Sequence, residues 1–234
     1  MFFDSSYQAR RHQIASYFDK TAVKAWEKLT SNEPLSKIRE SVRLGREKMK
    51  NHIISLIGKN YKGLTILDAG CGTGTLSIEI ADKGAEVTAI DISPSLIKIA
   101  KSRAPKKFKN NGSVNFIWGD MLESSLGEFD HIVLMDSIIH YRPEEAVQLI
   151  NALGSKCNKS LIFTFAPYTP ILGAMIFFGK LFPKKDRAPF LEPVSEKYLL
   201  GLLKENLPDW KVGQIKRITS GFYRSQAVEL IRAS

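Results

Sequence analysis

Cysteine is scarce in this 234-residue chain, because only Cys71 and Cys157 occur and they form no C-x-x-C pair. This excludes a disulfide framework and a cysteine-rich zinc site, and it favours a reducing compartment. Long hydrophobic runs are missing as well, since the apolar stretch at residues 171–182 is twelve residues long and contains a lysine. A membrane-spanning helix takes about 20 residues, so this stretch is too short to cross a bilayer. The first residues lack the basic and apolar pattern of a secretory signal, and we expect none.

Acidic residues are too few to balance the basic ones, and the chain carries a formal charge of +10. The excess lies mostly in residues 1–62, which hold thirteen Lys and Arg against six Asp and Glu, while the other 172 residues together carry +3. A solvated helix face explains such a segment as well as attraction to an acidic substrate, an anionic membrane surface or RNA. With 44% hydrophobic and 25% charged residues, the composition excludes wholesale disorder and a multi-span membrane protein.

Apolar stretches of strand character alternate with helix-length segments from residue 65 onward. We expect strands at 65–68, 86–90, 114–118, 131–135 and 161–165, and helices at 76–83, 94–103 and 143–156. This alternation predicts an α/β fold with right-handed crossovers and a largely parallel sheet. Residues 210–218 and 226–231 predict a terminal antiparallel hairpin, which gives seven strands in all. We expect residues 1–62 to form a basic helical lid or arm, 63–234 the main domain, and 166–194 an insertion after the fifth strand.

A glycine-rich motif, Asp68-Ala-Gly70-Cys-Gly72-Thr-Gly74, lies where the first strand meets the first helix of the sheet. Three alternate glycines let the backbone turn sharply and approach a ligand, and the following helix offers free N–H groups at its N-terminus. A dinucleotide-binding motif has the spacing Gly-x-Gly-x-x-Gly, whereas here the third glycine comes one position early. The motif therefore argues against NAD.

The motif resembles the first motif of the S-adenosylmethionine-dependent class I methyltransferases, which have a Rossmann-like fold. The resemblance implies that Asp68 faces the ammonium group of the methionine moiety and that Asp91, at the end of the second strand, accepts hydrogen bonds from two ribose hydroxyls. Asp120, at the end of the third strand, then accepts from the adenine amino group, and Met121 packs on the ring. These strand ends converge at the switch point of a doubly wound sheet. The candidate cofactor-binding residues are Asp68, Gly70, Cys71, Gly72, Gly74, Asp91, Ile92, Asp120, Met121 and Asp136.

The segment Asp136-Ser-Ile-Ile-His140-Tyr follows the fourth strand. It differs from the Asn/Asp-Pro-Pro-Tyr sequence of enzymes that methylate base amino groups, so a nucleic-acid substrate is disfavoured despite the charge. If the segment turns helically, Asp136 and His140 face the same side, and the acid can orient the imidazole beside the reactive methyl group. The alternative is a histidine that only caps or packs.

Several blocks beyond the glycine motif indicate a narrower family. Residues 17–26, 39–46, 136–141, 165–169 and 220–225 together resemble the magnesium-protoporphyrin IX O-methyltransferases of the chlorophyll pathway. The resemblance covers nearly all of residues 14–232. It implies methyl transfer from S-adenosylmethionine to one propionate of magnesium protoporphyrin IX, which gives the monomethyl ester and S-adenosylhomocysteine. The magnesium ion then belongs to the substrate, and no metal bound by the protein is implied.

The resemblance also implies roles near the reacting groups. His140 is the candidate catalytic residue that hydrogen-bonds or deprotonates the carboxyl group, and Tyr17 is a candidate part of a lid that excludes water. A propionate resembles a glutamate side chain with a pKa near 4.3, so it is ionised at neutral pH and needs no strong base. Ordinary core packing is the alternative for Tyr17 and for the insertion. The candidate substrate-binding residues are Phe165, Tyr168, Phe177 and Phe178.

Partners and a place in the cell follow from the same resemblance. We expect magnesium protoporphyrin IX as the substrate, contact with the large subunit of magnesium chelatase, peripheral contact with a membrane, and a cytoplasmic or plastid-stromal location. Nucleic acid is not expected as a partner. Three other functions remain open on the residues alone: O- or C-methylation of another small apolar acceptor such as a quinone precursor, methylation of RNA, and a non-catalytic subunit that only binds S-adenosylmethionine.

Overall fold

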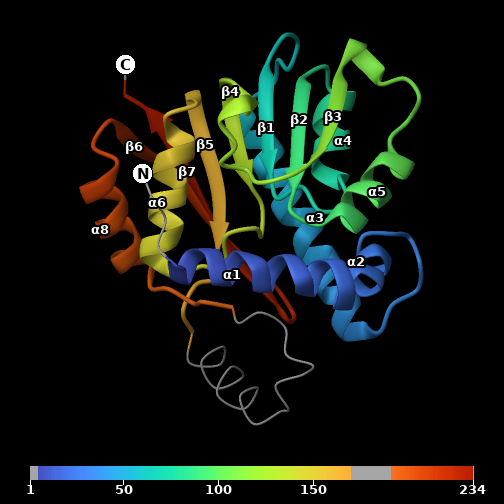
Figure 1. Cartoon of the computed structure of the whole chain (residues 1–234), viewed down its shortest axis with the longest axis horizontal. Coiled ribbons are helices and arrows are strands. Elements are labelled where there is room, and N and C mark those ends of the chain that lie inside the picture. The colour runs from blue at the N-terminus through green and yellow to red at the C-terminus, as the bar shows by residue number, and fades with distance from the viewer. Residues whose placement is uncertain (1–4, 170–190, 234) are drawn as a thin grey trace.

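A seven-stranded sheet forms the centre of the computed structural model, which describes residues 5–169 and 191–233 (Figure 1). The strands lie in the order β3-β2-β1-β4-β5-β7-β6. Their bounds are β1 Thr65–Ala69, β2 Glu86–Asp91, β3 Ser113–Trp118, β4 Phe129–Leu134, β5 Cys157–Phe165, β6 Trp210–Ser220 and β7 Tyr223–Arg232. Strands β1 to β5 pair in parallel, and β7 lies antiparallel between β5 and β6. The predicted seven-stranded α/β sheet with an antiparallel terminal strand is confirmed.

The order of the strands reverses between β1 and β4, since the chain runs outward from β1 to β3 and then returns to the other side of β1. In open α/β sheets such a switch point leaves a crevice at the carboxyl ends of the strands. The glycine motif and the acidic strand ends therefore meet at one edge of the sheet.

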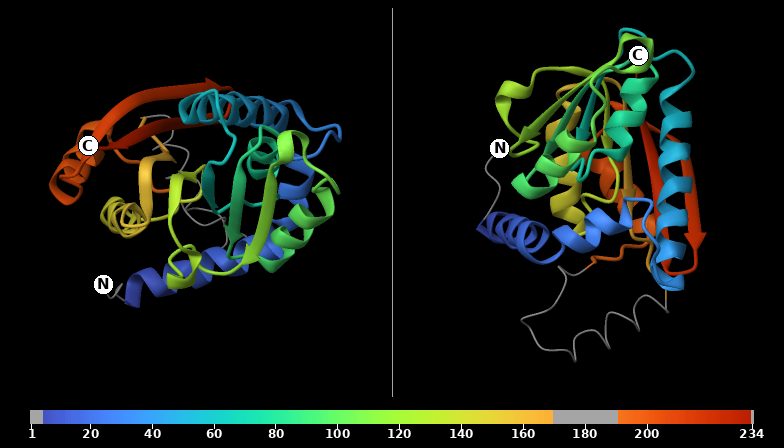
Figure 2. Two further views of the ribbon diagram at one scale, coloured as in Figure 1. Left: turned by 90° about the horizontal axis from the view of Figure 1, so that it is seen from above. Right: turned by 90° about the vertical axis from the view of Figure 1, so that its right-hand side faces the viewer.

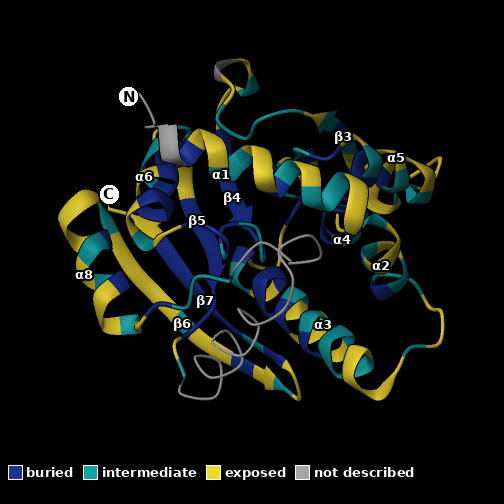
Figure 3. Cartoon of the chain, turned by 60° about the horizontal axis from the view of Figure 1, so that its bottom comes forward, coloured by how far each residue is buried: buried dark blue, intermediate teal, exposed yellow. Residues whose placement is uncertain are grey.

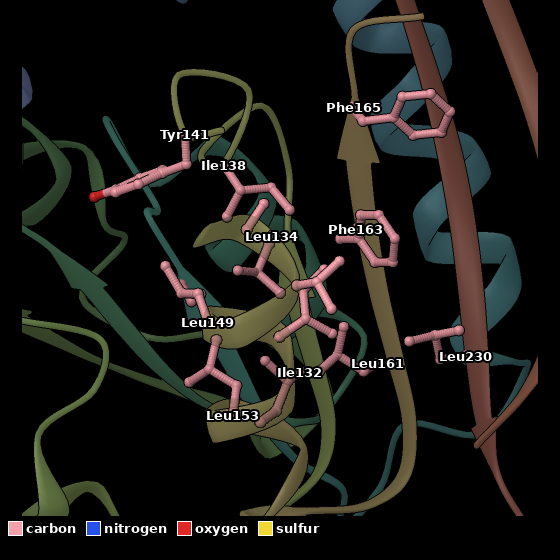
Figure 4. Close-up of a cluster of buried hydrophobic side chains, with 14 of the residues drawn as sticks. Ile132, Leu134, Ile138, Tyr141, Leu149, Leu153, Leu161, Phe163, Phe165 and Leu230 are labelled. Atoms are coloured by element: carbon pink, nitrogen blue, oxygen red, sulfur yellow. The ribbon is translucent and has the colours of Figure 1, made fainter. Parts of the chain in front are cut away.

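Helices cover both faces of the sheet. Among the described residues after β1, the α-helices are α4 Thr75–Asp82, α5 Pro94–Arg103, α6 Pro143–Gly154 and α8 Glu196–Asn206. On one face, Leu149 and Leu153 of α6 lie against β4 and β5, as Figure 4 shows, and leucines of α8 belong to the same buried cluster. On the other face, α4 and α5 pack with the long helix α3 (Lys37–Ile57). Met49, Ile53 and Ile57 of α3 are four residues apart, so they line one stripe of the helix and are buried.

The N-terminal region is helical, as predicted, and continues through α1 (Ser5–Ser16), a π-helical turn η1 (Tyr17–Thr21) and α2 (Val23–Leu29). Figure 1 shows α1 and α2 lying across the end of the sheet at which the arrowhead of β5 points. Figure 2 shows α3 upright beside β6 and β7. The division of the chain at residue 62 stays a prediction, and α3 packs on the sheet like the helices that follow it.

The terminal hairpin is tighter than expected. Strand β6 extends to Ser220 and β7 begins at Tyr223, so only Gly221 and Phe222 form the turn. Gly221 has φ 56°, a left-handed conformation that glycine adopts without strain. Most of β6 is exposed, whereas β4 and β5 are buried (Figure 3).

The two ends of the predicted insertion 166–194 lie side by side. Pro167 and Val194 form a parallel bridge, the Tyr168 N–H donates to the Val194 carbonyl at 2.9 Å, and the Val194 N–H donates to the Ala166 carbonyl at 3.0 Å. Residues 170–190, which include Phe177 and Phe178, lie outside the described part of the chain. Within the described ranges, no helix is both long and apolar enough to cross a membrane.

Candidate active site

A pocket with about 940 Å³ of empty space, part of which is open solvent, lies at the carboxyl edge of the sheet. Its floor comes from the ends of β1 to β4, and its cover comes from α1, η1, α2 and α3. The floor residues include Asp68, Gly70, Cys71, Gly72, Ile90, Asp91, Ile92, Gly119, Asp120, Met121, Met135, Asp136, Ser137 and Tyr141, and the cover residues are Tyr7, Arg11, Ile14, Phe18, Trp26 and Arg46. Nine of the ten predicted cofactor-binding residues therefore line one pocket, and the tenth, Gly74, caps α4 beside it.

Two glycines of the motif allow close approach of other segments. Gly70 has φ 84°, and a Cβ there would lie 2.4 Å from the Cβ of Ser137 in the segment after β4. Gly72 has φ 56°, and a Cβ there would lie 3.1 Å from Nε1 of Trp26 in α2. A side chain at either position would clash with its neighbour or force it to shift. The two positions therefore favour glycine both because φ is positive and because the neighbouring side chains leave no room for a Cβ.

Asp68 is the most deeply buried acid of the pocket, with 1% of its surface exposed. It accepts a hydrogen bond from Ser77 Oγ of α4 at 2.5 Å. Burial raises the pKa of Asp68 to about 6, and the nearby carboxylate of Asp91 acts in the same direction, while the Ser77 hydrogen bond and the charge of Arg46 lower it. At neutral pH the carboxylate is still mostly ionised, and a cation in the pocket would stabilise it further.

Asp91 holds the backbone of the glycine motif. Its two carboxylate oxygens accept from the Gly72 N–H at 2.8 Å and the Ser93 N–H at 2.9 Å. Burial raises the pKa of Asp91, and these two backbone hydrogen bonds oppose that effect. Each carboxylate oxygen has a second lone pair, so Asp91 keeps acceptor capacity for a ligand.

Asp120 has a partner that the sequence did not indicate. Its carboxylate pairs with Arg11 Nη1 of α1 at 2.5 Å and also accepts from the Leu122 N–H at 3.0 Å. If Asp120 accepts a hydrogen bond from an adenine amino group, as predicted, its carboxylate binds that group and the Arg11 guanidinium group at the same time. Met121 lies beside it on the pocket wall.

The segment after β4 does not form the expected helical turn, because residues 135–141 contain only bends and turns. Asp136 has φ 53°, and its carboxylate accepts from the hydroxyl groups of Tyr223 and Ser225 at 3.2 Å each, and pairs with Arg46. The prediction that helical spacing pairs Asp136 with His140 is therefore wrong. Strand β7 and helix α3 supply these partners, and Thr164 Oγ1 of strand β5 also donates to the Asp136 carboxylate, at 3.1 Å.

Neither of the two predicted catalytic residues is among the described residues that line the pocket. His140 is 8% exposed, its carbonyl oxygen accepts from Arg10 Nη1 at 3.1 Å, and its ring lies 5.6 Å from the ring of Phe18. Tyr17 packs edge-on against Phe18 at 5.3 Å, and burial raises its pKa. Phe18, which contacts both rings, lines the pocket. The roles of His140 and Tyr17 stay predictions.

The two described substrate-binding candidates differ in exposure. Phe165 is 4% exposed and belongs to the hydrophobic core, as Figure 4 shows, whereas Tyr168 is 58% exposed. Neither lines the pocket described above. Their role in binding a substrate stays a prediction.

Sequence reasoning missed the cover of the pocket, namely Tyr7, Arg11, Ile14, Phe18, Trp26 and Arg46. Phe18, Trp26 and Arg46 lie in the blocks 17–26 and 39–46 that resemble the family, but nothing in the spacing of these blocks shows which side chains turn inward. Ser137 was missed too, and its Oγ is buried with no hydrogen-bond partner in the part of the chain that the structure describes. Within those same ranges, no cluster of His, Cys, Asp and Glu side chains could hold a metal ion.

Comparison with known proteins gives consistent matches. The family described as "Magnesium-protoporphyrin IX methyltransferase C-terminus" matches residues 134–232, and the family described as "Methyltransferase domain" matches residues 66–158. The chain is 40% identical to the magnesium-protoporphyrin O-methyltransferase of Rhodobacter capsulatus, over 96% of this chain and 98% of that protein. It is 32% identical to the chloroplastic magnesium protoporphyrin IX methyltransferase of Arabidopsis thaliana, over 93% of this chain and 70% of that protein.

A solved structure is similar over the whole fold. The crystal structure of magnesium protoporphyrin IX methyltransferase from Synechocystis with bound SAH has a TM-score of 0.83 and 27% sequence identity. The match covers 95% of this chain and all of the other, at 100%.

Proposed function

The chain belongs to the magnesium-protoporphyrin O-methyltransferase family, and on that premise we propose that it transfers a methyl group from S-adenosylmethionine to one propionate of magnesium protoporphyrin IX. The products are the monomethyl ester and S-adenosylhomocysteine. The observation that carries the proposal is the single pocket in which the glycine motif, the acids at the strand ends and the aromatic cover meet.

The residues of this pocket fit S-adenosylmethionine. The backbone at Gly70 and Gly72 lines the pocket with no side chain, and a Cβ at either position would crowd Ser137 or Trp26. The buried Ser137 Oγ beside Gly70 has no hydrogen-bond partner among the described residues. Asp68 and Asp91 supply carboxylates for an ammonium group and for ribose hydroxyls. A ligand that carries positive charge also relieves the repulsion between these two acids. When bound, the cofactor supplies an electrophilic methyl group on a positively charged sulfur.

The protein contributes mainly position, because the propionate is already a carboxylate at neutral pH. Holding one carboxylate oxygen in a fixed direction can lower the barrier by up to roughly 7–11 kcal/mol. We assign this orienting role to His140, which can hydrogen-bond the carboxyl group after a shift of the Phe18 ring that lies against it. The cover formed by α1, η1 and α2 excludes water from the site.

Further aspects of this function rest on the resemblance alone. Contact with the large subunit of magnesium chelatase, peripheral membrane contact and a cytoplasmic or plastid-stromal location are proposals, and the basic N-terminal region is compatible with the first two. The insertion, whose two ends meet at Pro167 and Val194, is proposed to cover the macrocycle.

Binding of the macrocycle is tested by absorbance titration with magnesium protoporphyrin IX. We expect a saturable shift of the Soret band, because the porphyrin leaves water for an apolar site. A quinone-pathway phenol and a short RNA serve as competitors, and neither should reverse the shift. Absence of a shift, or displacement by the phenol, would contradict the proposal and favour another acceptor. Binding to RNA that weakens steeply with salt would favour the nucleic-acid alternative.

A further inference from the structure

A groove lies between helix α3 and strand β6, which Figure 2 shows side by side. It has about 700 Å³ of empty space, part of which is open solvent. The residues on its α3 side share one face of the helix, because helical neighbours recur every three or four positions. The groove is lined by Lys48, Asn51, His52 and Ser55 of α3 and by Lys216 and Ile218 of β6, and none of these residues lines the methyl-transfer pocket.

Positive charge lines this groove without a matching negative charge. Lys48 and Lys216 are exposed, and neither forms an ion pair with another residue in the described part of the chain. Lys50, two positions further along α3, differs from them because it pairs with Glu47 and Glu79. No acidic side chain is among the described residues that line the groove. The two lysines therefore leave an uncompensated positive field there.

His52 is the buried member of the groove lining. It is 8% exposed, and its Nε2 is buried with no hydrogen-bond partner among the described residues. Burial lowers the pKa of His52, and the charge of Lys216 lowers it further, so the ring is neutral at neutral pH. A buried polar atom without a partner is costly, and such atoms are rare in folded proteins. The groove thus contains a hydrogen-bonding group that the described chain does not satisfy.

These side chains suit an anion that presents oxygens in several directions. The two ammonium groups come from different elements, a helix and a strand, and act as point charges. Lysine binds phosphate in this way, whereas a carboxylate is matched better by the planar fork of an arginine. Asn51 adds an amide that can donate. Ser55 adds no donor, because its hydroxyl group already donates to the His52 carbonyl at 2.6 Å.

We propose that the groove between α3 and β6 binds a phosphate group through the ammonium groups of Lys48 and Lys216 and the imidazole of His52. The amide of Asn51 is a further donor. A small soluble phosphate and the headgroup of an anionic lipid present the same oxygens, so either source fits this chemistry. The site shares no lining residue with the methyl-transfer pocket, and the inference does not depend on the proposed function.

Binding is tested by titrating the protein with inorganic phosphate at constant ionic strength, kept with chloride, while the histidine ring signals are followed by NMR. The signal of His52, identified by its absence in His52→Gln, should shift and saturate with a Kd of about 1 mM or below. His131 is buried in β4 and serves as the internal reference, so its signal should not move.

Paired variants locate the binding. In Lys48→Gln/Lys216→Gln, the affinity for phosphate should fall at least about tenfold, because two charged hydrogen bonds are lost. Lys37→Gln/Lys98→Gln is the control, since it removes the same charge from two exposed lysines outside the groove, and its affinity should stay within about twofold of wild type. Both variants should bind S-adenosylhomocysteine within about twofold of wild type, which shows that they are folded.

Cosedimentation with phosphatidylcholine vesicles, with and without phosphatidic acid, distinguishes the two sources of the phosphate group. If phosphatidic acid makes wild-type protein sediment more than the Lys48→Gln/Lys216→Gln variant, a lipid headgroup occupies the groove. If the two sediment alike while inorganic phosphate still shifts the His52 signal, the ligand is a soluble phosphate. The inference is overturned if inorganic phosphate leaves the His52 signal unchanged, or if the groove variant binds phosphate as tightly as its control.

Discussion

At the scale of one residue, the buried carboxylate of Asp68 suits a positively charged ligand but lowers the free energy of unfolding of the ligand-free protein. This carboxylate is nearly fully buried and lies near that of Asp91, and Arg46, whose charge lowers the pKa of Asp68, is already paired with Asp136. A group whose pKa is raised on folding binds protons more readily in the native state than in the unfolded chain. The free energy of unfolding therefore falls as the pH rises from about 4 to about 6, between the unfolded and folded pKa values.

Replacing Asp68 by Asn should remove this loss of stability. In the absence of ligand, the free energy of unfolding of the variant minus that of wild type should be larger at pH 8 than at pH 4, by up to about 3 kcal/mol. This difference corresponds to the rise in the pKa of Asp68 on folding. It should also bind S-adenosylhomocysteine more weakly, because the ammonium group loses its counter-charge. Urea unfolding at the two pH values and calorimetry provide the measurements. An equal stability difference at both pH values would show that burial does not perturb Asp68.

His140→Phe tests the predicted role of the histidine. Turnover should fall by about 100-fold or more, in the range attributed to a positioned acid or base, while the affinity for S-adenosylhomocysteine should change only a few fold. The reason is that His140 contacts the Phe18 ring but is not among the described residues that line the pocket with the glycine motif. A methyl-transfer assay and calorimetry measure the two effects. Unchanged turnover would remove His140 from the mechanism.

The acids of the pocket could be predicted from the sequence because each ends a strand, and parallel strands place their carboxyl ends at one edge. Arg46, Trp26 and Phe18 could not be predicted in the same way. They belong to helices that precede the first strand, and a helical period shows which residues share a face but not which partner that face meets. Asp136 could be located, but its partners on α3 and β7 are 87 to 90 positions away in the chain.

At the scale of elements, α3 and the terminal hairpin depend on close contact at Gly45. A Cβ at this position would lie 2.4 Å from Cδ1 of Tyr223, so the helix lies against the start of β7. Tyr223 in turn donates to Asp136 in the pocket. The sequence predicted both the helix and the hairpin, but not this contact, because an unremarkable glycine within a helix carries no signal of its neighbour.

Gly45→Ala should destabilise the protein by about 1–3 kcal/mol, as overpacking commonly does. Gly201→Ala in α8 is the matched control, since a Cβ there would meet nothing within 4 Å. The control should gain about 0.5–1 kcal/mol from helix propensity. Urea unfolding measures both. If the two substitutions had the same sign, α3 would not be packed as closely on β7 as described.

Helix α2 is fastened to α5 by one side chain. Arg103 donates to the Thr30 carbonyl at 3.2 Å, to Thr30 Oγ1 at 2.8 Å and to the Glu27 carbonyl at 2.9 Å. Arg103→Ala should therefore let α2 open more often. Amide hydrogen exchange in α2 should become about tenfold faster, which corresponds to about 1.4 kcal/mol of local stability.

Lys98→Ala is the control for this experiment, because Lys98 is exposed on the same helix and its side chain makes no hydrogen bond or ion pair with another described residue. It should leave exchange in α2 unchanged. Bound S-adenosylhomocysteine should slow exchange in α2 in both variants, since Trp26 lies over the glycine motif. Equal exchange in the Arg103 and Lys98 variants would mean that other contacts hold α2.

For the whole molecule, the structure shows how part of the N-terminal positive charge is used. Arg10 pairs with Glu145 and Glu192, Arg11 pairs with Asp120, and Arg46 pairs with Asp136. Each pair joins a helix before residue 62 to the sheet domain. Part of the N-terminal positive charge therefore forms ion pairs that hold the cover on the rest of the protein. Composition alone could not distinguish such paired arginines from a solvated face or a nucleic-acid-binding face.

The central claim is that this one pocket passes a methyl group from S-adenosylmethionine to an ionised propionate of a magnesium porphyrin. The most direct measurement is mass spectrometry of a reaction that contains purified protein, magnesium protoporphyrin IX and S-adenosylmethionine with a deuterated methyl group. We predict a porphyrin that carries one deuterated methyl ester, formed in equal amount with S-adenosylhomocysteine. An unmodified porphyrin, in a mixture where a phenol or an RNA gains the label instead, would contradict the account.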